Sequence, residues 1–259
     1  VLRTLRKIAP SLKIITSPKA KQMLADFYQI EDNVHVIEDG ETLSLGNHTL
    51  QFFITPFVHW PETMVTYETS RKILFSCDVF GGYGALPGGI FDDECRNPAY
   101  YESESLRYYV NIVAKFSRQT LIALKKLENI PIDVIAPSHG LVWRKDPAKI
   151  VSLYKKWAEY ASNTGVEKGI TLIYGSMYGN TELIMNAIAE GISDEGVPLE
   201  IFDAARTHVS YILPSVWSRS AFLIGAPTYE VSMFPPVKNV LDMLLTKKVT
   251  GKKTGYNGS

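Results

Sequence analysis

The chain has 259 residues, 46% of them hydrophobic and 21% charged, a composition typical of globular proteins with room for two domains. Its 27 basic and 27 acidic residues cancel to a net charge of zero, which argues against nucleic acid or an anionic membrane as a partner. The apolar runs are far shorter than the roughly 20 residues that cross a bilayer, and there are only two cysteines, so we expect no membrane anchor, no disulfide framework and a reducing, cytoplasmic location.

The first part of the chain predicts short strands followed by helices. The chain is expected to begin inside a helix over residues 1–8. Expected strands are residues 11–16, 34–37, 42–45, 48–55, 64–68, 72–76 and 132–136, and expected helices are 18–27, 98–128 with a break near Phe116, and 147–162. Turn residues predict that 42–45 pairs with 48–55, and 64–68 with 72–76, as hairpins. A glycine-rich loop runs over residues 81–89.

Residues 166–169 are expected to be a linker, because Asn163, Thr164 and Gly165 end the last of these helices. The sequence therefore predicts two domains, over residues 1–167 and 168–259. In the second domain we expect strands at residues 170–173 and 221–225.

The most specific motif is ITLIYGSMYGNT, from Ile170 to Thr181. A β-branched apolar run ends in a turn rich in glycine and hydroxyl groups, and a helical pattern follows at once. Such a turn presents backbone N–H groups and hydroxyls to an anion at the helix N-terminus. The loop has no Lys or Arg and lacks the GxxxxGK[ST] pattern, so it suits a monophosphate rather than a triphosphate with magnesium. The plainer alternative is an ordinary strand–turn–helix.

This loop resembles the flavodoxin phosphate loop, [ST]-x-x-G-N-T, which binds the monophosphate FMN. A second loop should follow a further buried strand, and residues 226–230 follow the expected strand 221–225. Its backbone can meet the polar edge of a flavin ring while an aromatic side chain covers the ring face. The predicted FMN contacts are Ser176, Met177, Tyr178, Gly179, Asn180 and Thr181 in the first loop, and Pro227, Thr228, Tyr229 and Glu230 in the second.

Three candidate metal ligands follow apolar strands in the first part of the chain: His59, Asp78 and His139. Two imidazoles and one carboxylate suit iron, manganese or zinc. By spacing alone, a lone histidine in a loop is more often an ordinary hydrogen-bonded or surface residue than a metal ligand.

The sequence around these residues resembles the flavodiiron proteins. The segments that carry the resemblance are HWPETM at 59–64, FSCDVFG at 75–81 and PSHGLVWR at 137–144, with Glu62 where Asp is common. The resemblance covers essentially the whole chain. It implies an α/β fold class: a partial metallo-β-lactamase-like αββα domain for two irons, followed by a partial flavodoxin-like doubly wound parallel sheet for FMN.

Within that resemblance, His59 is implied as a terminal ligand of one iron and His139 as a ligand of the other. Asp78 is implied as the bridge between the two. Cys77 is expected to be a packed thiol. The remaining histidines match nothing in the family pattern and are expected on the surface or in strands: His35, His48 and His208.

The family also takes ligands from a His-x-Glu-x-Asp-His segment ahead of these residues, and a flavodoxin has a third FMN loop, which is expected to follow residues 253–257. Neither is present among the 259 residues. We therefore expect an internal fragment of a longer protein, which by itself neither holds two irons nor turns over. The alternative is a divergent protein that has lost both ends of the site.

The resemblance implies an oxidoreductase that reduces O2 to water, or NO to N2O, at a non-haem di-iron centre that receives electrons from FMN. Rubredoxin or a reduced deazaflavin would be the electron donor. A head-to-tail homodimer would bring the FMN of one subunit to the irons of the other. Two alternatives stay open: a lactamase-type zinc hydrolase fused to a flavodoxin, and a non-enzymatic FMN electron carrier.

Overall fold

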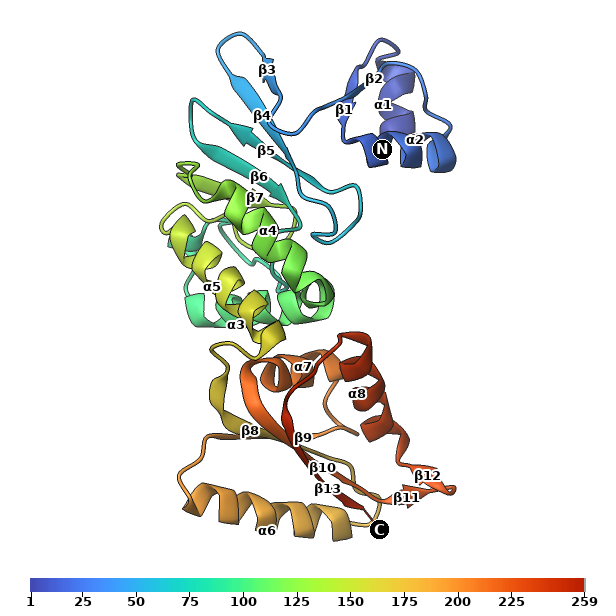
Figure 1. The fold of residues 1–259 in the computed structure, drawn as a ribbon, viewed down its shortest axis with the longest axis vertical. Coiled ribbons are helices and arrows are strands. Elements are labelled where there is room, and N and C mark those ends of the chain that lie inside the picture. The colour runs from blue at the N-terminus through green and yellow to red at the C-terminus, as the bar shows by residue number, and fades with distance from the viewer. Residues whose placement is uncertain (259) are drawn as a thin grey trace. The chain divides into compact units, whose positions relative to one another are not determined.

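A computed structural model describes residues 1–258, which form two compact units (Figure 1). The first unit contains residues 1–101 and 118–152, and the second contains residues 102–117 and the chain from Leu153 onward. The chain thus passes between the units three times, whereas the sequence predicts one boundary after residue 167, and that boundary stays a prediction. No helix within the described residues is long and apolar enough to cross a membrane.

A five-stranded sheet with the order β3-β4-β5-β6-β7 forms the centre of the first unit. The strands are β3 Thr42–Ser44, β4 Thr49–Ile54, β5 Met64–Glu68, β6 Ile73–Cys77 and β7 Val134–Pro137. Neighbours are antiparallel except β6 and β7, which run parallel, and both predicted hairpins are confirmed. Leu74 and Ile135 are fully buried in the middle of the sheet. The parallel pair matters for function, because its two carboxyl ends lie at one edge of the sheet.

The start of the chain forms a small layer of its own within this unit. It contains α1 Leu2–Ile8, β1 Ile14–Thr16, α2 Pro18–Tyr28 and β2 Val34–Val36, and β1 pairs with β2 in parallel. Helix α2 begins after Ser17, whose hydroxyl accepts a hydrogen bond from Ala20 N at 3.3 Å and donates one to Glu62 O at 2.7 Å. The helix cap is thereby tied to the loop that follows β4.

The long helical region predicted over residues 98–128 is broken where expected. It consists of α3 Pro98–Tyr108, a π-helical turn Tyr109–Val113, a 3-10 turn Ala114–Phe116 and α4 Ser117–Leu127. The Ser117 hydroxyl donates to Ala114 O at 2.7 Å and lies 2.8 Å from the Tyr109 hydroxyl, which supports the break. Helix α5, Pro147–Glu159, continues in a 3-10 turn and ends at Asn163, whose φ of 58° is left-handed.

The second unit contains a four-stranded parallel sheet with the order β13-β10-β8-β9. Its strands are β8 Glu167–Tyr174, β9 Leu199–Asp203, β10 Arg219–Ala226 and β13 Lys253–Gly258, and its helices are α6 Asn180–Asp194, α7 Val209–Ser218 and α8 Pro235–Thr246. Helix α6 covers one face, and α7 and α8 lie together on the other (Figure 1). After β8 the chain forms β9 on one side of β8, and it then crosses over to form β10 on the other side of β8. Such a reversal marks the ligand-binding edge of doubly wound sheets.

The linker predicted at residues 166–169 is wrong from Glu167 onward, because β8 begins there. Glu167 pairs with Arg219 in β10, and its carboxylate accepts hydrogen bonds from Lys156 Nζ and Tyr160 Oη, each at 2.9 Å. The Lys156 hydrogen bond, above all, holds the pKa of Glu167 below its ordinary value. The charged residues and glycine resemble a linker in sequence, but partners elsewhere in the chain make them part of a strand.

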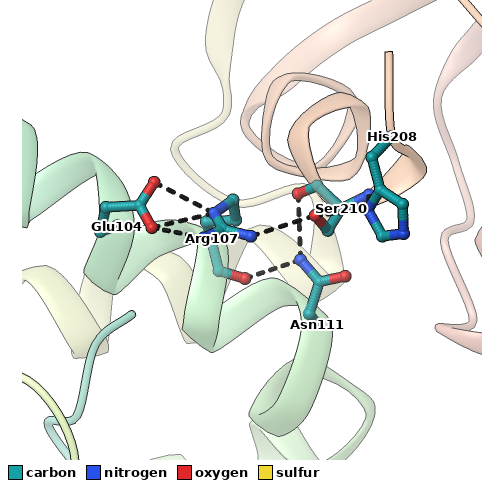
Figure 2. A network of polar contacts seen from close by, with 5 residues as sticks. All are labelled: Glu104, Arg107, Asn111, His208 and Ser210. Atoms are coloured by element: carbon teal, nitrogen blue, oxygen red, sulfur yellow. Dashed lines mark hydrogen bonds and ion pairs between the residues drawn. The ribbon is translucent and has the colours of Figure 1, made fainter. Parts of the chain in front are cut away.

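A polar network joins residues 102–117 to helix α7 inside the second unit (Figure 2). Arg107 donates to both carboxylate oxygens of Glu104 and, through Nη1, to Ser210 Oγ at 3.1 Å. Asn111 Nδ2 donates to Arg107 O at 2.7 Å and to Ser210 O at 3.1 Å. His208 caps α7 by accepting from Ser210 N at 3.3 Å. The two hydrogen bonds to Ser210 join residues about 100 positions apart in the sequence. The Glu104–Arg107 pair, the Asn111–Arg107 bond and the His208 cap are local.

Candidate functional site

His59 lies in a closed loop that follows β4. Thr55 N donates to Thr63 O at 2.9 Å, and the Thr63 hydroxyl donates to Trp60 O at 2.8 Å. Phe57 N donates to Trp60 O at 2.7 Å, so the loop is a compact turn rather than an open connection. Hydrogen bonds within this loop therefore fix the backbone around His59.

Asp78 and His139 follow the two parallel strands β6 and β7. Two backbone hydrogen bonds join their surroundings: Ser138 N donates to Cys77 O at 2.7 Å, and Gly82 N donates to His139 O at 3.2 Å. Because the strands are neighbours and point the same way, their ends deliver both side chains to one edge of the sheet.

The structure brings the three candidate ligands together. His59 Nε2 lies 3.1 Å from Asp78 Oδ2, and His139 Nε2 lies 3.5 Å from Asp78 Oδ1. The side chains of His59 and Asp78 are 24% and 19% exposed, whereas that of His139 is 58% exposed. Each imidazole thus faces a different oxygen of one carboxylate.

This donor set can be shared between two metal ions. The two histidines form two pairs with Asp78, one pair on each carboxylate oxygen. Within residues 1–258, no group of three or more His, Cys, Asp or Glu side chains is arranged as a metal site. A carboxylate with one oxygen for each of two metals, and one imidazole on each side, suits a pair of first-row transition metals. The roles of these three residues as iron ligands stay a prediction.

Each turn that carries a candidate ligand contains a left-handed backbone conformation. Phe57 has φ 63°, Cys77 φ 55° and Phe80 φ 66°, and Gly140 follows with φ 81°. Such conformations are costly for a residue with a Cβ, so they persist only where the surrounding contacts impose them, and they cluster at functional sites. Nothing in the sequence points to Phe57, Cys77 or Phe80, because only glycine and asparagine signal this conformation.

Two further side chains of the segments that carry the candidate ligands are Cys77 and Glu62. Cys77 is exposed, so the expectation of a packed thiol is wrong: it is the last residue of β6 and its side chain points off the sheet's buried face. Desolvation of the thiol, and then the charge of Asp78, nevertheless raise its pKa. Glu62 Oε2 is buried and has no hydrogen-bond partner within the described residues. It borders a cavity of about 660 Å³ together with Trp60.

The segment that follows His139 is held from outside by an acidic turn at Asp92–Glu94. Asp92 accepts hydrogen bonds from the backbone of Arg144 at 2.9 Å and of Lys145 at 3.0 Å. The Arg144 guanidinium donates to Asp93 at 3.0 Å and stacks 3.6 Å above the Phe91 ring. These contacts hold the polypeptide that follows His139 against the turn that follows the Asp78 region.

The first predicted flavin loop lies between β8 and α6. Gly179 N donates to Ser176 Oγ at 3.0 Å, and α6 begins at Asn180 directly after Gly179, which has φ 87°. Ser176 and Thr181 are half-buried, and Tyr178 is exposed. The turn leaves hydroxyls and the first N–H groups of α6 at one point, as an anion site requires.

The second predicted loop follows β10, the parallel neighbour of β8, at the point where the strand order reverses. It forms a small hairpin that the sequence did not predict, from β11 Thr228–Tyr229 and β12 Ser232–Met233. Pro227 and Thr228 border a largely apolar cavity of about 780 Å³. Tyr229 meets Phe234 edge-on with ring centres 6.2 Å apart. The two loops follow neighbouring parallel strands, and the ten residues stay predicted FMN contacts.

Comparisons with known proteins agree with both halves of this description. Residues 1–140 match the family model described as ODP family beta lactamase, and residues 172–255 match the flavodoxin model. An anaerobic nitric oxide reductase flavorubredoxin from Pectobacterium atrosepticum is 37% identical over 234 residues, which cover 88% of this chain and 45% of the relative. The corresponding protein of Escherichia coli is 37% identical over 237 residues, 88% of this chain and 48% of the relative. The chain thus spans about half the length of these curated relatives.

Solved structures of similar proteins cover almost all of the chain. Rubredoxin oxygen:oxidoreductase from Desulfovibrio gigas gives a TM-score of 0.91 at 29% identity, over 99% of this chain and 64% of that one. A flavoprotein from Thermotoga maritima gives 0.85 at 34% identity, over 99% and 64%. The flavodiiron protein from Giardia intestinalis gives 0.88 at 26% identity, over 94% and 59%. The predicted fold class, a lactamase-like domain followed by a flavodoxin-like domain, is confirmed.

Proposed function

Because this chain belongs to the flavodiiron proteins, with an ODP-family β-lactamase-like domain followed by a flavodoxin domain, we propose that it is part of an oxidoreductase that reduces nitric oxide to nitrous oxide. The observation that carries the proposal is the shared carboxylate: Asp78 turns one oxygen to His59 and the other to His139. Two NO molecules, two electrons and two protons give N2O and water. Two adjacent metal sites suit the joining of two NO molecules better than one site would.

In this proposal the chain's own residues hold and orient the metals. His59 and His139 would each offer one imidazole nitrogen to a metal, and Asp78, which faces both histidines, would offer one carboxylate oxygen on each side. The exposed side of His139 leaves room for solvent or substrate to approach. When bound, two irons would supply the redox-active positions at which the diatomic substrate is held and reduced.

FMN is proposed as the electron donor to the metals, bound at the switch point of the second unit. Ser176 and Thr181, with the first N–H groups of α6, would hold its phosphate. The hairpin of β11 and β12 would border the ring, with Tyr229 against it. This proposal is supported by the match to the flavodoxin family and by the two loops at neighbouring parallel strands.

Dioxygen is the second candidate substrate. The names of the curated relatives favour NO, whereas the structural neighbour from Desulfovibrio gigas is named an oxygen oxidoreductase. We propose rubredoxin as the protein that supplies electrons to FMN, supported by the same names, and a reduced deazaflavin as the alternative. A head-to-tail homodimer is proposed from the resemblance to flavodiiron proteins, and sedimentation of the full-length protein tests it.

The test of the function is metal content and NO consumption in the full-length protein with Asp78→Ala. Without the shared carboxylate, neither metal keeps its arrangement, so we expect loss of most of the iron and at least a hundredfold lower NO consumption, equivalent to roughly 2.7 kcal/mol or more. Asp133→Ala is the matched control, because this exposed carboxylate only pairs with Lys72 at 3.5 Å. Purification of the unmodified protein with zinc rather than iron would instead favour the lactamase-type hydrolase, and FMN without any metal would favour the electron carrier.

A further inference from the structure

The backbone that carries His139 lies directly against the loop that carries Asp78. We call residues 77–82 the Asp78 loop and residues 138–143 the His139 segment. Three hydrogen bonds join them: Ser138 N to Cys77 O at 2.7 Å, Gly82 N to His139 O at 3.2 Å, and Trp143 Nε1 to Phe80 O at 3.2 Å. The position of the His139 ring relative to Asp78 is therefore set by main-chain contact between two segments that are about 60 residues apart.

Gly140 is the point of closest approach. A Cβ at this position would lie 2.7 Å from Gly82 N and 3.0 Å from both Gly82 Cα and Gly82 O. All three atoms are backbone, so no flexible side chain can move aside. The φ of 81° also disfavours any residue with a Cβ. A methyl group at position 140 must push the two segments apart, and this disrupts the hydrogen bond from Gly82 N to His139 O.

His59 is held by a different set of contacts. Its loop is closed by Thr55 and Thr63, and the Ser17 hydroxyl donates to Glu62 O at 2.7 Å. None of these residues belongs to the Asp78 loop or to the His139 segment. Within residues 1–258, the hydrogen bonds that hold the His59 loop therefore differ from those that join the Asp78 loop to the His139 segment, and the two histidine–carboxylate pairs share Asp78.

We propose that Gly140 is a positioning residue that sets the His139–Asp78 half of the metal centre independently of the His59–Asp78 half. The inference rests on the proposed function, because it assigns the two halves to two metal ions. A larger residue at position 140 displaces His139 from Asp78 and selectively weakens one of the two metal positions. The other position keeps its ligands.

The experiment compares Gly140→Ala with Gly46→Ala in the full-length, iron-loaded protein. Gly46 has the same φ of 81°, but a Cβ there has nothing within 4 Å, so it carries the same backbone strain without the collision. Iron per chain should fall by half in Gly140→Ala and stay unchanged in Gly46→Ala. The remaining iron should give the EPR signal of an isolated high-spin ferric ion, in place of a coupled pair. FMN content should not change in either variant.

A second readout needs no metal. Hydrogen exchange of the Gly82 amide in the iron-free protein should be at least tenfold faster in Gly140→Ala than in the unmodified protein and Gly46→Ala, because its bond to His139 O is disrupted. If Gly140→Ala does not fold, Trp143→Phe keeps a smaller aromatic side chain in the core but removes the Nε1 hydrogen bond to Phe80 O, and it should lower iron content in the same half. Equal, paired iron in Gly140→Ala and Gly46→Ala would overturn the inference and leave the function standing. Absence of paired iron in the unmodified protein would instead overturn the proposed function.

Discussion

Glu68, at the end of β5, shows how one residue can make the stability of the first unit depend on pH. Its carboxylate accepts hydrogen bonds from the Ser70 hydroxyl, from Arg71 N at 2.7 Å and from Ser70 N at 3.2 Å, and it pairs with His48 Nδ1 at 3.2 Å. The Ser70 hydroxyl is the largest cause that lowers the pKa of Glu68 from 4.5 to about 2. Because the folded pKa is below the unfolded one, Glu68 stabilises the fold at pH values above 4.5. This stabilisation is lost as the pH falls from 4.5 to about 2.

We therefore expect Glu68→Gln to lower the free energy of unfolding at neutral pH, and the difference from the unmodified protein to shrink between pH 4.5 and about 2. Urea denaturation at a series of pH values measures both quantities. Glu190→Gln is the control, because Glu190 is exposed on α6. A difference that stays constant down to pH 2 would show that the hydrogen bonds do not depend on the charge of Glu68.

Among the elements, the guanidinium of Arg107 makes several of the polar contacts between the 102–117 segment and α7. Arg107 donates to the carboxylate of Glu104 and to Ser210 (Figure 2). Its guanidinium also lies 4.3 Å from the centre of the Tyr211 ring. The side chain of Glu104 is only 6% exposed, so its charge depends on Arg107 for compensation. An unpaired buried charge costs far more than an exposed one.

Arg107→Ala should therefore lower the free energy of unfolding of the second unit by about 3 kcal/mol. The control is Lys125→Ala, which removes an ion pair of the same i,i+3 spacing whose side chains are 79% and 52% exposed, and it should change stability by less than about 0.5 kcal/mol. Denaturant midpoints give both values. The double variant Glu104→Ala/Arg107→Ala should recover part of the loss, because no charge is then left unpaired. Equal effects of Arg107→Ala and Lys125→Ala on the free energy of unfolding would contradict the role assigned to Arg107.

For the whole molecule, two compact units imply that the two cofactors stabilise different residues. FMN at a concentration 100 times its dissociation constant should add about 2.7 kcal/mol to the stability of the unit that binds it. In hydrogen exchange followed by mass spectrometry, we expect FMN to protect β8 and β10 and to leave β4, β5 and β6 unchanged. Riboflavin, which lacks the phosphate, should protect less, because the N-terminus of α6 then has no anion to bind. Protection of β4 to β6 by FMN alone would show that the units do not respond separately.

Much of the fold and part of the site could be predicted from local sequence. Turn residues between short strand patterns predicted the two hairpins of the first unit, and the change from a β-branched run to GSMYGNT predicted the β8 turn and helix α6. His59, Asp78 and His139 follow apolar strands, but this position alone left them ambiguous, and the resemblance of the surrounding segments to flavodiiron proteins identified them as candidates. Periodicity, turn chemistry and motifs of this kind are properties of neighbouring residues, so the sequence by itself determined them.

Only the tertiary structure decided how these pieces meet. Local sequence could not predict that each imidazole faces a different oxygen of Asp78, or that Gly140 lies against the backbone of Gly82. Nor could it predict that residues 102–117 pack into the second unit, or that Glu167 belongs to a strand. Each of these features depends on groups brought together from distant parts of the chain, and packing and hydrogen-bond geometry determine which groups those are.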